Sequence, residues 1–525
     1  MPPLLRAPRR VHTLVKPILA ALAALLLLAA PASASRTQEA TFQDDDLLIF
    51  AETDQVVATL DELKALGVER LRVSMFWRAI AKGNELDTKP EGFDATDPED
   101  YEPGAWDRWD RIVTLARERG MDVNFNVTTP APDWATGTPA RADIDETYEP
   151  NAAEFGNFVR AAATRYDGNH GQPRVSYWSL QNEPNQPGWL TPQWVQRDGK
   201  WVEAAPRIYR AMVGAAWTAL QETGHGSDTI LVGETAPKGL RTNRGETRAI
   251  DALRFIRRLY CLDDNLQGLQ GAAAEAAGCP TANQLADFPA QNPGLFRMTG
   301  WAHHPYELLF APNKKPTWRD WSTMANLGDL QGLLRRIYAR YAQPLTGDVP
   351  LYLTEFGYQT NPPEPRGVTR SQQARYLNHA EWIAWRNSDV RTLAQFLLRD
   401  DAEPISATFQ SGLQTIDGKR KGAYAAYRFP IHVPKAKVRR GRQITVWGLP
   451  RPAVNGSRPA VEVQFRRRGS KRWRRVKTVT GDADRGYVNT RMRLRRSGAV
   501  RLAWGGITSR TVKVRATRAR KARRR

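Results

Sequence analysis

The feature that most constrains the fold is a regular alternation of short apolar segments with longer segments of helical period. It runs from Thr41 to Phe429, and eight such pairs can be counted. Alternation of this kind is typical of βα units around a parallel sheet. Eight strands and eight helices in about 390 residues predict an α/β fold, a closed (β/α)8 TIM barrel, rather than an open doubly wound sheet.

The expected strands are rich in β-branched and aromatic residues, and the expected helices show apolar stripes. The strands are predicted at residues 41–50, 68–76, 122–128, 175–180, 229–233, 299–303, 350–354 and 391–398. The helices are predicted at residues 56–66, 105–119, 152–166, 205–223, 249–260, 324–341, 371–386 and 423–428. Residues 83–104 and 241–296 are expected to be loop insertions at the strand ends.

The character of the chain changes after Pro430. Residues 431–525 hold 30 basic and 3 acidic side chains, whereas residues 1–430 hold 47 basic and 52 acidic ones. The main body is therefore slightly acidic, which removes support for nucleic-acid binding there. Apolar and basic positions alternate with period two in residues 431–514, so we expect a small antiparallel β-sandwich with arginines on an exposed face. Residues 515–525 are expected to be a disordered basic tail.

The amino terminus has the pattern of a secretory signal. Basic residues precede the apolar run 17–30, and Ala32-Ser33-Ala34 supplies small residues for cleavage, so residues 1–34 are expected to be removed on export. The run is shorter than the ~20 residues of a spanning helix; an uncleaved anchor is the alternative, and no other segment could span a bilayer. The predicted location is therefore extracellular or on the cell surface.

The chain has two cysteines, Cys261 and Cys279. In an exported protein such a pair is expected to form a disulfide, with two buried thiols as the alternative. The seven histidines show no spacing typical of a metal site, and no glycine-rich cofactor motif follows any strand. We therefore expect neither a metal nor a cofactor, and we expect a monomer.

Candidate catalytic residues follow two of the predicted strands. Active sites of such barrels lie at the carboxyl ends of the strands, so polar residues directly after a strand are examined first. A lone glutamate there is usually solvated or salt-bridged, but a pair on strands four and seven is a sharper signal. The two motifs are Asn182-Glu183-Pro184 and Thr354-Glu355-Phe356-Gly357.

This combination resembles the acid/base and nucleophile motifs of the clan A glycoside hydrolases, close to families 5 and 39, over roughly residues 40–430. The resemblance implies a retaining β-glycosidase with Glu183 as general acid/base and Glu355 as nucleophile. It also implies that Asn182 holds the sugar 2-hydroxyl and that Arg72 supports the nucleophile. His304-Pro305-Tyr306 is similar to the His-x-Tyr segment of strand six in the clan. A purely structural ion pair for Arg72 and a core position for His304 are the alternatives.

Acetal hydrolysis requires one carboxyl group that keeps its proton and another that is ionised. A separation of ~5–5.5 Å predicts a covalent intermediate, and ~6.5–9.5 Å predicts direct attack by water. Arg72 beside Glu355 would favour the carboxylate. Apolar neighbours and the second negative charge would favour a protonated Glu183.

Aromatic residues near the strand ends are candidates for sugar binding, because flat rings suit the C–H faces of sugars. Trp134 and Trp189 are the first candidates, and Trp301 is a further one. Clan members commonly end strand eight with a tryptophan, which this chain lacks, so Phe396 or Trp301 is left to form the floor beneath the sugar. His303 is expected to face the helix layer, because adjacent strand residues point to opposite sides.

The sequence thus predicts a secreted retaining β-glycoside hydrolase that acts on a polysaccharide or oligosaccharide. A carbohydrate-binding or adhesion protein on an inactive barrel is the alternative from another class. A nucleic-acid binder acting through residues 431–525 is a third reading. Outside the cell the available polyanions are cell-wall polymers, acidic polysaccharides and membrane surfaces, so we expect this region to bind an anionic cell-surface polymer and no specific nucleic acid.

Overall fold

The computed structural model describes residues 35, 38–242, 244–280, 282–402, 404, 408–452 and 456–518. The expected signal segment, residues 1–34, lies outside these ranges, as do residues 519–525 of the expected tail. None of the helices in the described ranges combines the length and the apolar content that crossing a bilayer requires.

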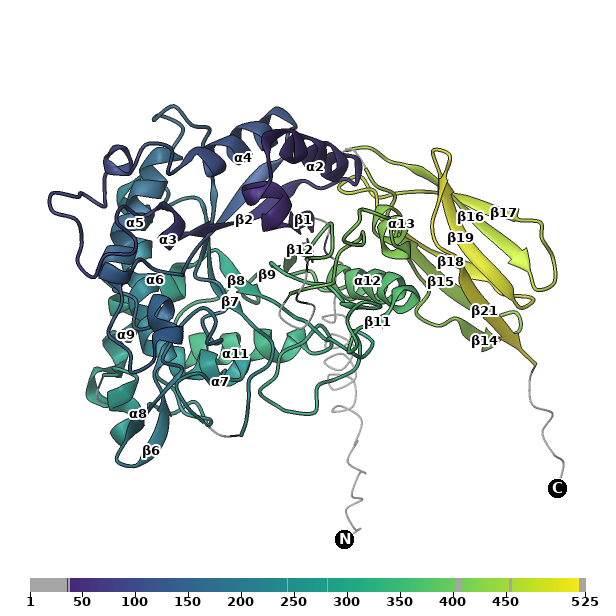
Figure 1. Cartoon of the computed structure of the whole chain (residues 1–525). Coiled ribbons are helices and arrows are strands. Elements are labelled where there is room, and N and C mark those ends of the chain that lie inside the picture. Colours follow the sequence, from purple (N-terminus) through teal and green to yellow (C-terminus); the bar gives the residue numbers. More distant parts are fainter. Residues whose placement is uncertain are drawn as a thin grey trace, which may run out of the picture.

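Eight parallel strands close into a barrel in the order β1-β12-β9-β8-β7-β4-β3-β2 (Figure 1). They are β1 (Glu39–Gln43), β2 (Arg70–Phe76), β3 (Asp122–Thr128), β4 (Tyr177–Leu180), β7 (Thr229–Thr235), β8 (Gly300–His303), β9 (Leu351–Leu353) and β12 (Val390–Phe396). The predicted (β/α)8 barrel is therefore confirmed.

The longer helices lie where the apolar stripes predict them. They are α2 (Thr53–Ala65), α4 (Asp107–Glu118), α5 (Ala152–Arg165), α6 (Ala205–Glu222), α7 (Ala252–Leu259), α11 (Leu327–Arg340), α12 (Arg370–Trp385) and α13 (Gly422–Arg428). Shorter elements occupy the loops: α3 (Trp77–Ile80), α8 (Gly271–Ala276), α9 (Phe288–Gln291), α10 (Pro293–Arg297), the hairpin β5 (Trp194–Arg197) and β6 (Lys200–Glu203), and the pair β10 (Thr360–Asn361) and β11 (Val368–Thr369).

The first strand is shorter than the sequence predicts. It ends at Gln43 rather than at residue 50, and Asp46–Phe50 form a π-helical turn. The cause is Asp44, whose carboxylate accepts backbone N–H bonds from Leu398 at 2.9 Å and from Leu47 at 3.1 Å. These bonds end the strand and tie it to the last strand of the barrel, where the ring closes.

Side chains along β2 show how the barrel interior becomes charged. Leu71 and Val73 pack in the large apolar core that the sheet shares with the helices. Arg70, on the opposite face, pairs with Glu39 at 2.8 Å and stacks on the ring of Tyr177 at 3.4 Å. Strand alternation therefore directs the arginines of β2 into the barrel.

The cysteine pair forms a disulfide, as the sequence predicts. Cys261 lies just after α7 and Cys279 just after α8. Besides α7, which corresponds to the predicted helix 249–260, the surrounding segment 241–296 contains α8, α9 and most of α10, so it is not a plain loop insertion. The disulfide closes part of this segment into a loop beside the barrel.

The carboxyl-terminal domain consists of two packed sheets with a small apolar core between them. One sheet has the order β13 (Ile431–His432), β15 (Gln443–Gly448), β18 (Val488–Arg493). The other has the order β14 (Lys437–Arg439), β21 (Val512–Thr517), β19 (Gly498–Trp504), β16 (Ala460–Arg467), β17 (Arg474–Thr480), with β20 (Ile507–Thr508) paired to β19.

Two details of this domain differ from the prediction. The pair β14 and β21 is parallel, whereas the other strands pair antiparallel. The last strand runs through Thr517, beyond the boundary predicted at residue 514, because residues 515–517 pair with β14.

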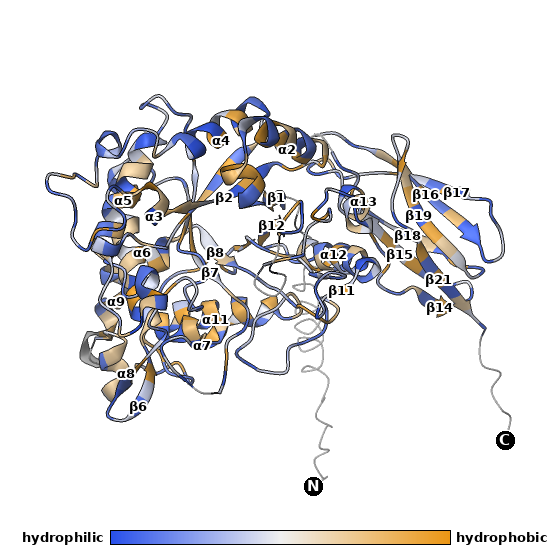
Figure 2. Cartoon of the chain, viewed as in Figure 1, coloured by the Kyte–Doolittle hydropathy of each residue, from blue (hydrophilic) through white to orange (hydrophobic). Residues whose placement is uncertain are grey.

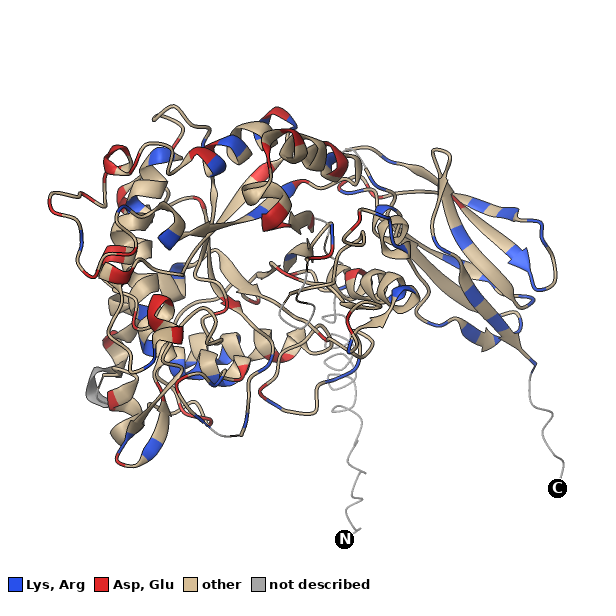
Figure 3. Ribbon diagram, viewed as in Figure 1, with Lys and Arg blue, Asp and Glu red and all other residues tan. Residues whose placement is uncertain are grey.

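Apolar and polar residues alternate along the strands of this domain (Figure 2), and the exposed positions are largely Lys and Arg (Figure 3).

The carboxyl-terminal domain packs on helix α12 of the barrel. Arg451 donates to the carboxylate of Glu381 on this helix at 2.6 Å, and both side chains are buried. The ring of Trp447 packs against Trp385 of the helix and against Tyr487 of its own domain. A buried ion pair and an aromatic cluster therefore hold the two domains together.

Candidate active site

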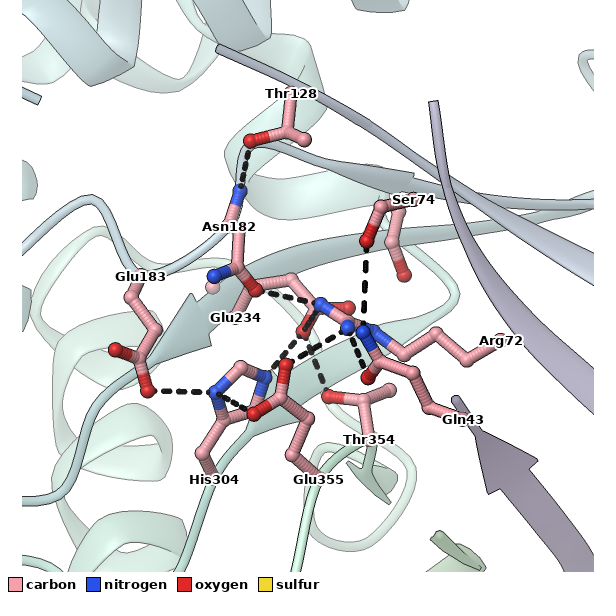
Figure 4. Close-up of polar contacts among 12 residues, drawn as sticks. Gln43, Arg72, Ser74, Thr128, Asn182, Glu183, Glu234, His304, Thr354 and Glu355 are labelled. Carbon is pink, nitrogen blue, oxygen red and sulfur yellow. Dashed lines mark hydrogen bonds and ion pairs between the residues drawn. The ribbon is translucent and has the colours of Figure 1, made fainter. Parts of the chain in front are cut away.

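The carboxyl ends of the barrel strands place polar side chains in one cluster (Figure 4). Glu183 follows β4 and Glu355 follows β9, the fourth and seventh strands of the barrel. One carboxylate oxygen of each lies within 4.8 Å of the other. The two glutamates that the sequence singles out are therefore neighbours, although they are far apart along the chain.

Arg72, at the centre of the cluster, is fully buried. Its Nη1 donates to Glu355 Oε1 at 2.8 Å and to Gln43 Oε1 at 2.5 Å. Its Nη2 donates to Asn182 Oδ1 at 2.7 Å and to Glu234 Oε2 at 3.0 Å. Burial lowers the pKa of this guanidinium, but the carboxylates of Glu234 and Glu355 raise it further, so Arg72 stays charged. It fixes the orientation of side chains from four other strands.

His304 lies between the carboxylates. Its Nδ1 is 2.8 Å from Glu183 Oε1 and 3.5 Å from Glu355 Oε2, and its Nε2 is 2.7 Å from Glu234 Oε2. Burial opposes a charge on the ring, but the three carboxylates outweigh it and raise the pKa of His304 to about 10. The ring is therefore an imidazolium that donates from both nitrogens. Glu183, His304 and Glu355 are close enough to bind a metal ion, but an imidazolium has no lone pair to offer one.

Glu234 is the functional residue that sequence reasoning missed. It lies at the end of β7, is fully buried, and accepts hydrogen bonds from Arg72, His304 and Thr354. Burial raises the pKa of its carboxyl, but Arg72 and His304 outweigh that effect and lower it to about 2. Its position directly after the predicted strand 229–233 was a partial signal, but regular strand alternation does not predict that it faces inward.

A local irregularity of the backbone turns Glu234 into the barrel. The pairing of β7 with β8 shifts register between Val232 and Thr235, and Glu234 has a φ of 43°. Gly233, with a φ of 117°, allows this bulge, since a Cβ there would lie 2.5 Å from the ring of Trp301. Strained backbone of this kind is concentrated at functional sites.

Glu355 is more deeply buried than Glu183: their side chains are 10% and 19% exposed. Tyr306 donates its hydroxyl to Glu355 Oε2 at 3.0 Å. Burial raises the pKa of Glu355, the charges of His304 and Arg72 oppose the rise, and the neighbouring Glu183 adds to it. The sequence predicts the contact with Arg72, which favours the ionised carboxylate of Glu355. Burial acts in the opposite direction and raises the pKa of this carboxyl.

The charges of the cluster leave one carboxylate without a counter-charge. Arg72 and His304 are positive, whereas Glu183, Glu234 and Glu355 are acidic. Arg72 and His304 hold the pKa of Glu234 low, whereas burial and the neighbouring Glu183 raise the pKa of Glu355. The cluster thus holds one more carboxyl group than it holds cations, as acid and base chemistry requires.

The two glutamates open into a cavity of about 350 Å³. Its lining includes Asn182 and four aromatic side chains: Trp189, Tyr306, Phe396 and Phe409. Trp189 and Tyr306, which the sequence analysis singles out, line this cavity, and so does Phe396 from the end of β12.

Two predicted tryptophans do not line this cavity. Trp134 packs against Trp77 and Phe93 and donates to a backbone carbonyl, so it supports the loop 83–104. Trp301 is fully buried in the core shared with the helices. His303 also faces the helix layer, as predicted, and forms hydrogen bonds with Thr235 and Ser322. Trp301 lies two residues before His303 and therefore on the same face of β8.

Comparisons with known proteins concern the fold alone. No family model matches the chain, and no curated protein matches it. Solved structures of similar fold include a family 39 glycoside hydrolase from Bacteroides cellulosilyticus WH2, with 12% identity, 89% of this chain and 80% of that chain covered, and a TM-score of 0.47.

Two further structures are similar to the same extent. They are GH5_18 from Streptomyces cattleya (16% identity, 75% of this chain and 79% of that chain covered, TM-score 0.45) and a β-xylosidase from Caulobacter crescentus CB15 (15% identity, 90% and 97% covered, TM-score 0.44). At these identities and TM-scores the similarities carry no argument about activity, which is derived below from the site.

Proposed function

We propose that this protein is a retaining β-glycoside hydrolase. The observation that carries the proposal is the pair Glu183 and Glu355, with one oxygen of each within 4.8 Å of the other at the mouth of the barrel. Such a short separation favours a covalent glycosyl-enzyme over direct attack by water, for which the carboxyl groups stand ~6.5–9.5 Å apart. The aromatic lining of the cavity suits a sugar ring.

The mechanism assigns different steps to the two glutamates. Glu183, the more exposed one, protonates the glycosidic oxygen as Glu355 attacks the anomeric carbon, so that the leaving sugar departs with the proton. Glu355 is oriented by Arg72 and Tyr306. In the second step Glu183 takes a proton from water, which attacks the anomeric carbon and frees Glu355. Two inversions give net retention.

The test is hydrolysis of aryl β-glycosides and β-linked oligosaccharides by the full chain, followed by NMR of the first product formed. We expect a β-anomer from at least one substrate. An α-anomer would contradict the retaining mechanism. A folded chain that binds these sugars but hydrolyses none of them would favour the inactive carbohydrate-binding barrel.

We also propose that the protein is exported and held on an anionic polymer at the cell surface by its carboxyl-terminal domain. The disulfide supports export, because disulfides persist in oxidising compartments. The exposed lysines and arginines of this domain support the retention, and attraction of this kind is screened by salt.

Fractionation of producing cells tests both statements. We expect the protein in the cell-wall fraction at low salt and in the medium after a wash with 1 M NaCl. Replacing exposed Arg491 and Arg493 by serine should lower the salt needed for release. A cytosolic protein would contradict export, and release that does not depend on salt would contradict electrostatic retention.

A further inference from the structure

A second hollow adjoins the catalytic cavity. It has a volume of about 700 Å³ and lies between the segment after β8 and the segment after β9. Lys238, Leu308 and Gln359 line both the hollow and the catalytic cavity. The two spaces are therefore neighbours that share part of their walls, and a chain of sugars bound in one would bring its next units close to the other.

The hollow is positively charged, although residues 1–430 as a whole are slightly acidic. Its lining contains four basic side chains, Lys238, Lys314, Lys315 and Arg366, and two acidic ones. One of the acids, Glu307, pairs with Lys238 at 3.0 Å.

The second acidic side chain of the hollow is Glu364. Glu364 accepts the backbone N–H of Arg366 at 2.8 Å. Lys314, Lys315 and the guanidinium of Arg366 form no ion pair with any residue that the structure describes. Glu364 keeps its negative charge, so the lining carries four positive and two negative side chains, and three of the positive ones have no ion-pair partner in the described chain.

Apolar side chains stand beside these charges. Leu308, Leu309 and Phe310 are 45%, 50% and 55% exposed, and Leu309, Phe310 and Trp321 line the hollow. A contiguous exposed apolar patch beside a cavity is typical of a ligand-binding groove. The combination suits a ligand that presents both an apolar ring face and an anionic group.

We propose that this hollow is a subsite for an anionic saccharide unit, one that carries a carboxylate, sulfate or phosphate group. The occupant is a saccharide rather than a protein or a lipid, because the hollow shares three lining residues with the cavity that holds Glu183 and Glu355. This assignment of substrate class rests on the proposed glycosidase function, but binding at the subsite does not require turnover. Lys314 and Lys315 supply the charge, and the apolar wall supplies the surface for the ring.

The experiment is calorimetric titration of the full chain with two matched probes, β-1,4-linked trimannuronate and β-1,4-linked mannotriose. They share a backbone and differ in their carboxylates. We expect trimannuronate to bind at least about tenfold more tightly. Mannotriose carrying one 6-sulfate or one 6-phosphate group distinguishes the sources of the anion, and any of the three anionic probes bound tenfold more tightly than mannotriose supports the subsite. Equal affinity for all four probes would overturn it.

A matched pair of variants locates the effect. Lys314→Ala/Lys315→Ala removes two adjacent charges from the hollow, and Lys471→Ala/Arg472→Ala removes two adjacent exposed charges from the carboxyl-terminal domain. We expect only the first variant to lose the preference for the anionic probe, by about tenfold. Equal losses in both variants would assign the preference to overall charge and overturn the subsite.

Binding and turnover are measured separately, so the two proposals fail in different ways. A preference for the anionic probe without hydrolysis of any glycoside would retain the subsite and overturn the glycosidase. Hydrolysis of neutral glycosides without tighter binding of the anionic probes would retain the glycosidase and overturn the subsite.

Discussion

Replacing Glu355 by alanine is expected to reduce kcat by about 10⁴-fold or more, because the reaction loses the group that forms the covalent intermediate. Azide should restore turnover. The substitution removes a carboxylate but leaves Arg72 and the hydroxyl of Tyr306, which both donate to it in the wild type. A small anion can bind between these donors and attack the anomeric carbon. The product is then a glycosyl azide with the configuration opposite to that of the substrate.

Glu183→Ala is the matched control for this experiment. Here Glu355 can still form the glycosyl-enzyme from a substrate with a good leaving group, and azide then attacks that intermediate. The glycosyl azide should therefore keep the configuration of the substrate. Two variants that give azides of opposite configuration would identify both roles. A Glu355→Ala protein that hydrolyses as fast as the wild type without azide would exclude Glu355 as nucleophile.

Replacing Glu234 by glutamine is expected to have the largest effect on stability. The substitution preserves the shape of the side chain but leaves the buried charges of Arg72 and His304 without their shared carboxylate. Removing one partner of a buried ion pair costs roughly 3–5 kcal/mol. Urea unfolding at pH 7 should show a loss of this size. Glu154→Gln breaks a partly exposed pair with Lys89, and it should cost less than about 1 kcal/mol.

The pH dependence gives an independent check on Glu234. The pKa of its carboxyl is about 2 in the folded protein, below the ordinary value of 4.5. The stabilisation is therefore fully present above pH 4.5 and is lost as the pH falls toward 2. The difference in unfolding free energy between wild type and Glu234→Gln should narrow over this range. A difference that stays constant between pH 5 and pH 3 would show that the charge of Glu234 does not stabilise the fold.

The barrel was predictable because its signal is repeated. Each strand is largely apolar, and each helix has an apolar stripe along one face. An error at one boundary, such as the end of the first strand, does not change the count of eight strand–helix pairs. Glu183 and Glu355 were predictable for a related reason: each lies within three residues of a strand end, and the mouth of a barrel brings such positions together. The distance between their two carboxyl groups could not be predicted, because it depends on strand tilt and side-chain rotamers.

Other parts of the site needed three-dimensional information. Glu234 faces inward only because the backbone bulges at Gly233, and regular alternation predicts no such bulge. Trp301 is a different case, since the alternation that places His303 in the helix layer places Trp301 there too. Trp134 lies in a loop, where no periodicity predicts the direction of a side chain. The hollow beside Lys314 is formed by two loops and has no sequence signature.

The cluster has two basic and three acidic side chains, and this odd number of ionisable groups has a consequence for the whole catalytic cycle. On the proposed mechanism, the resting site holds Arg72 and His304 as cations, Glu234 and Glu355 as anions, and a neutral Glu183. Their sum is zero. In the glycosyl-enzyme, Glu355 is a neutral ester and Glu183 has become the second anion, so the sum is again zero. The net charge of these five groups is thus conserved while a bond and a proton move, and neither step of the reaction leaves an extra ion among them.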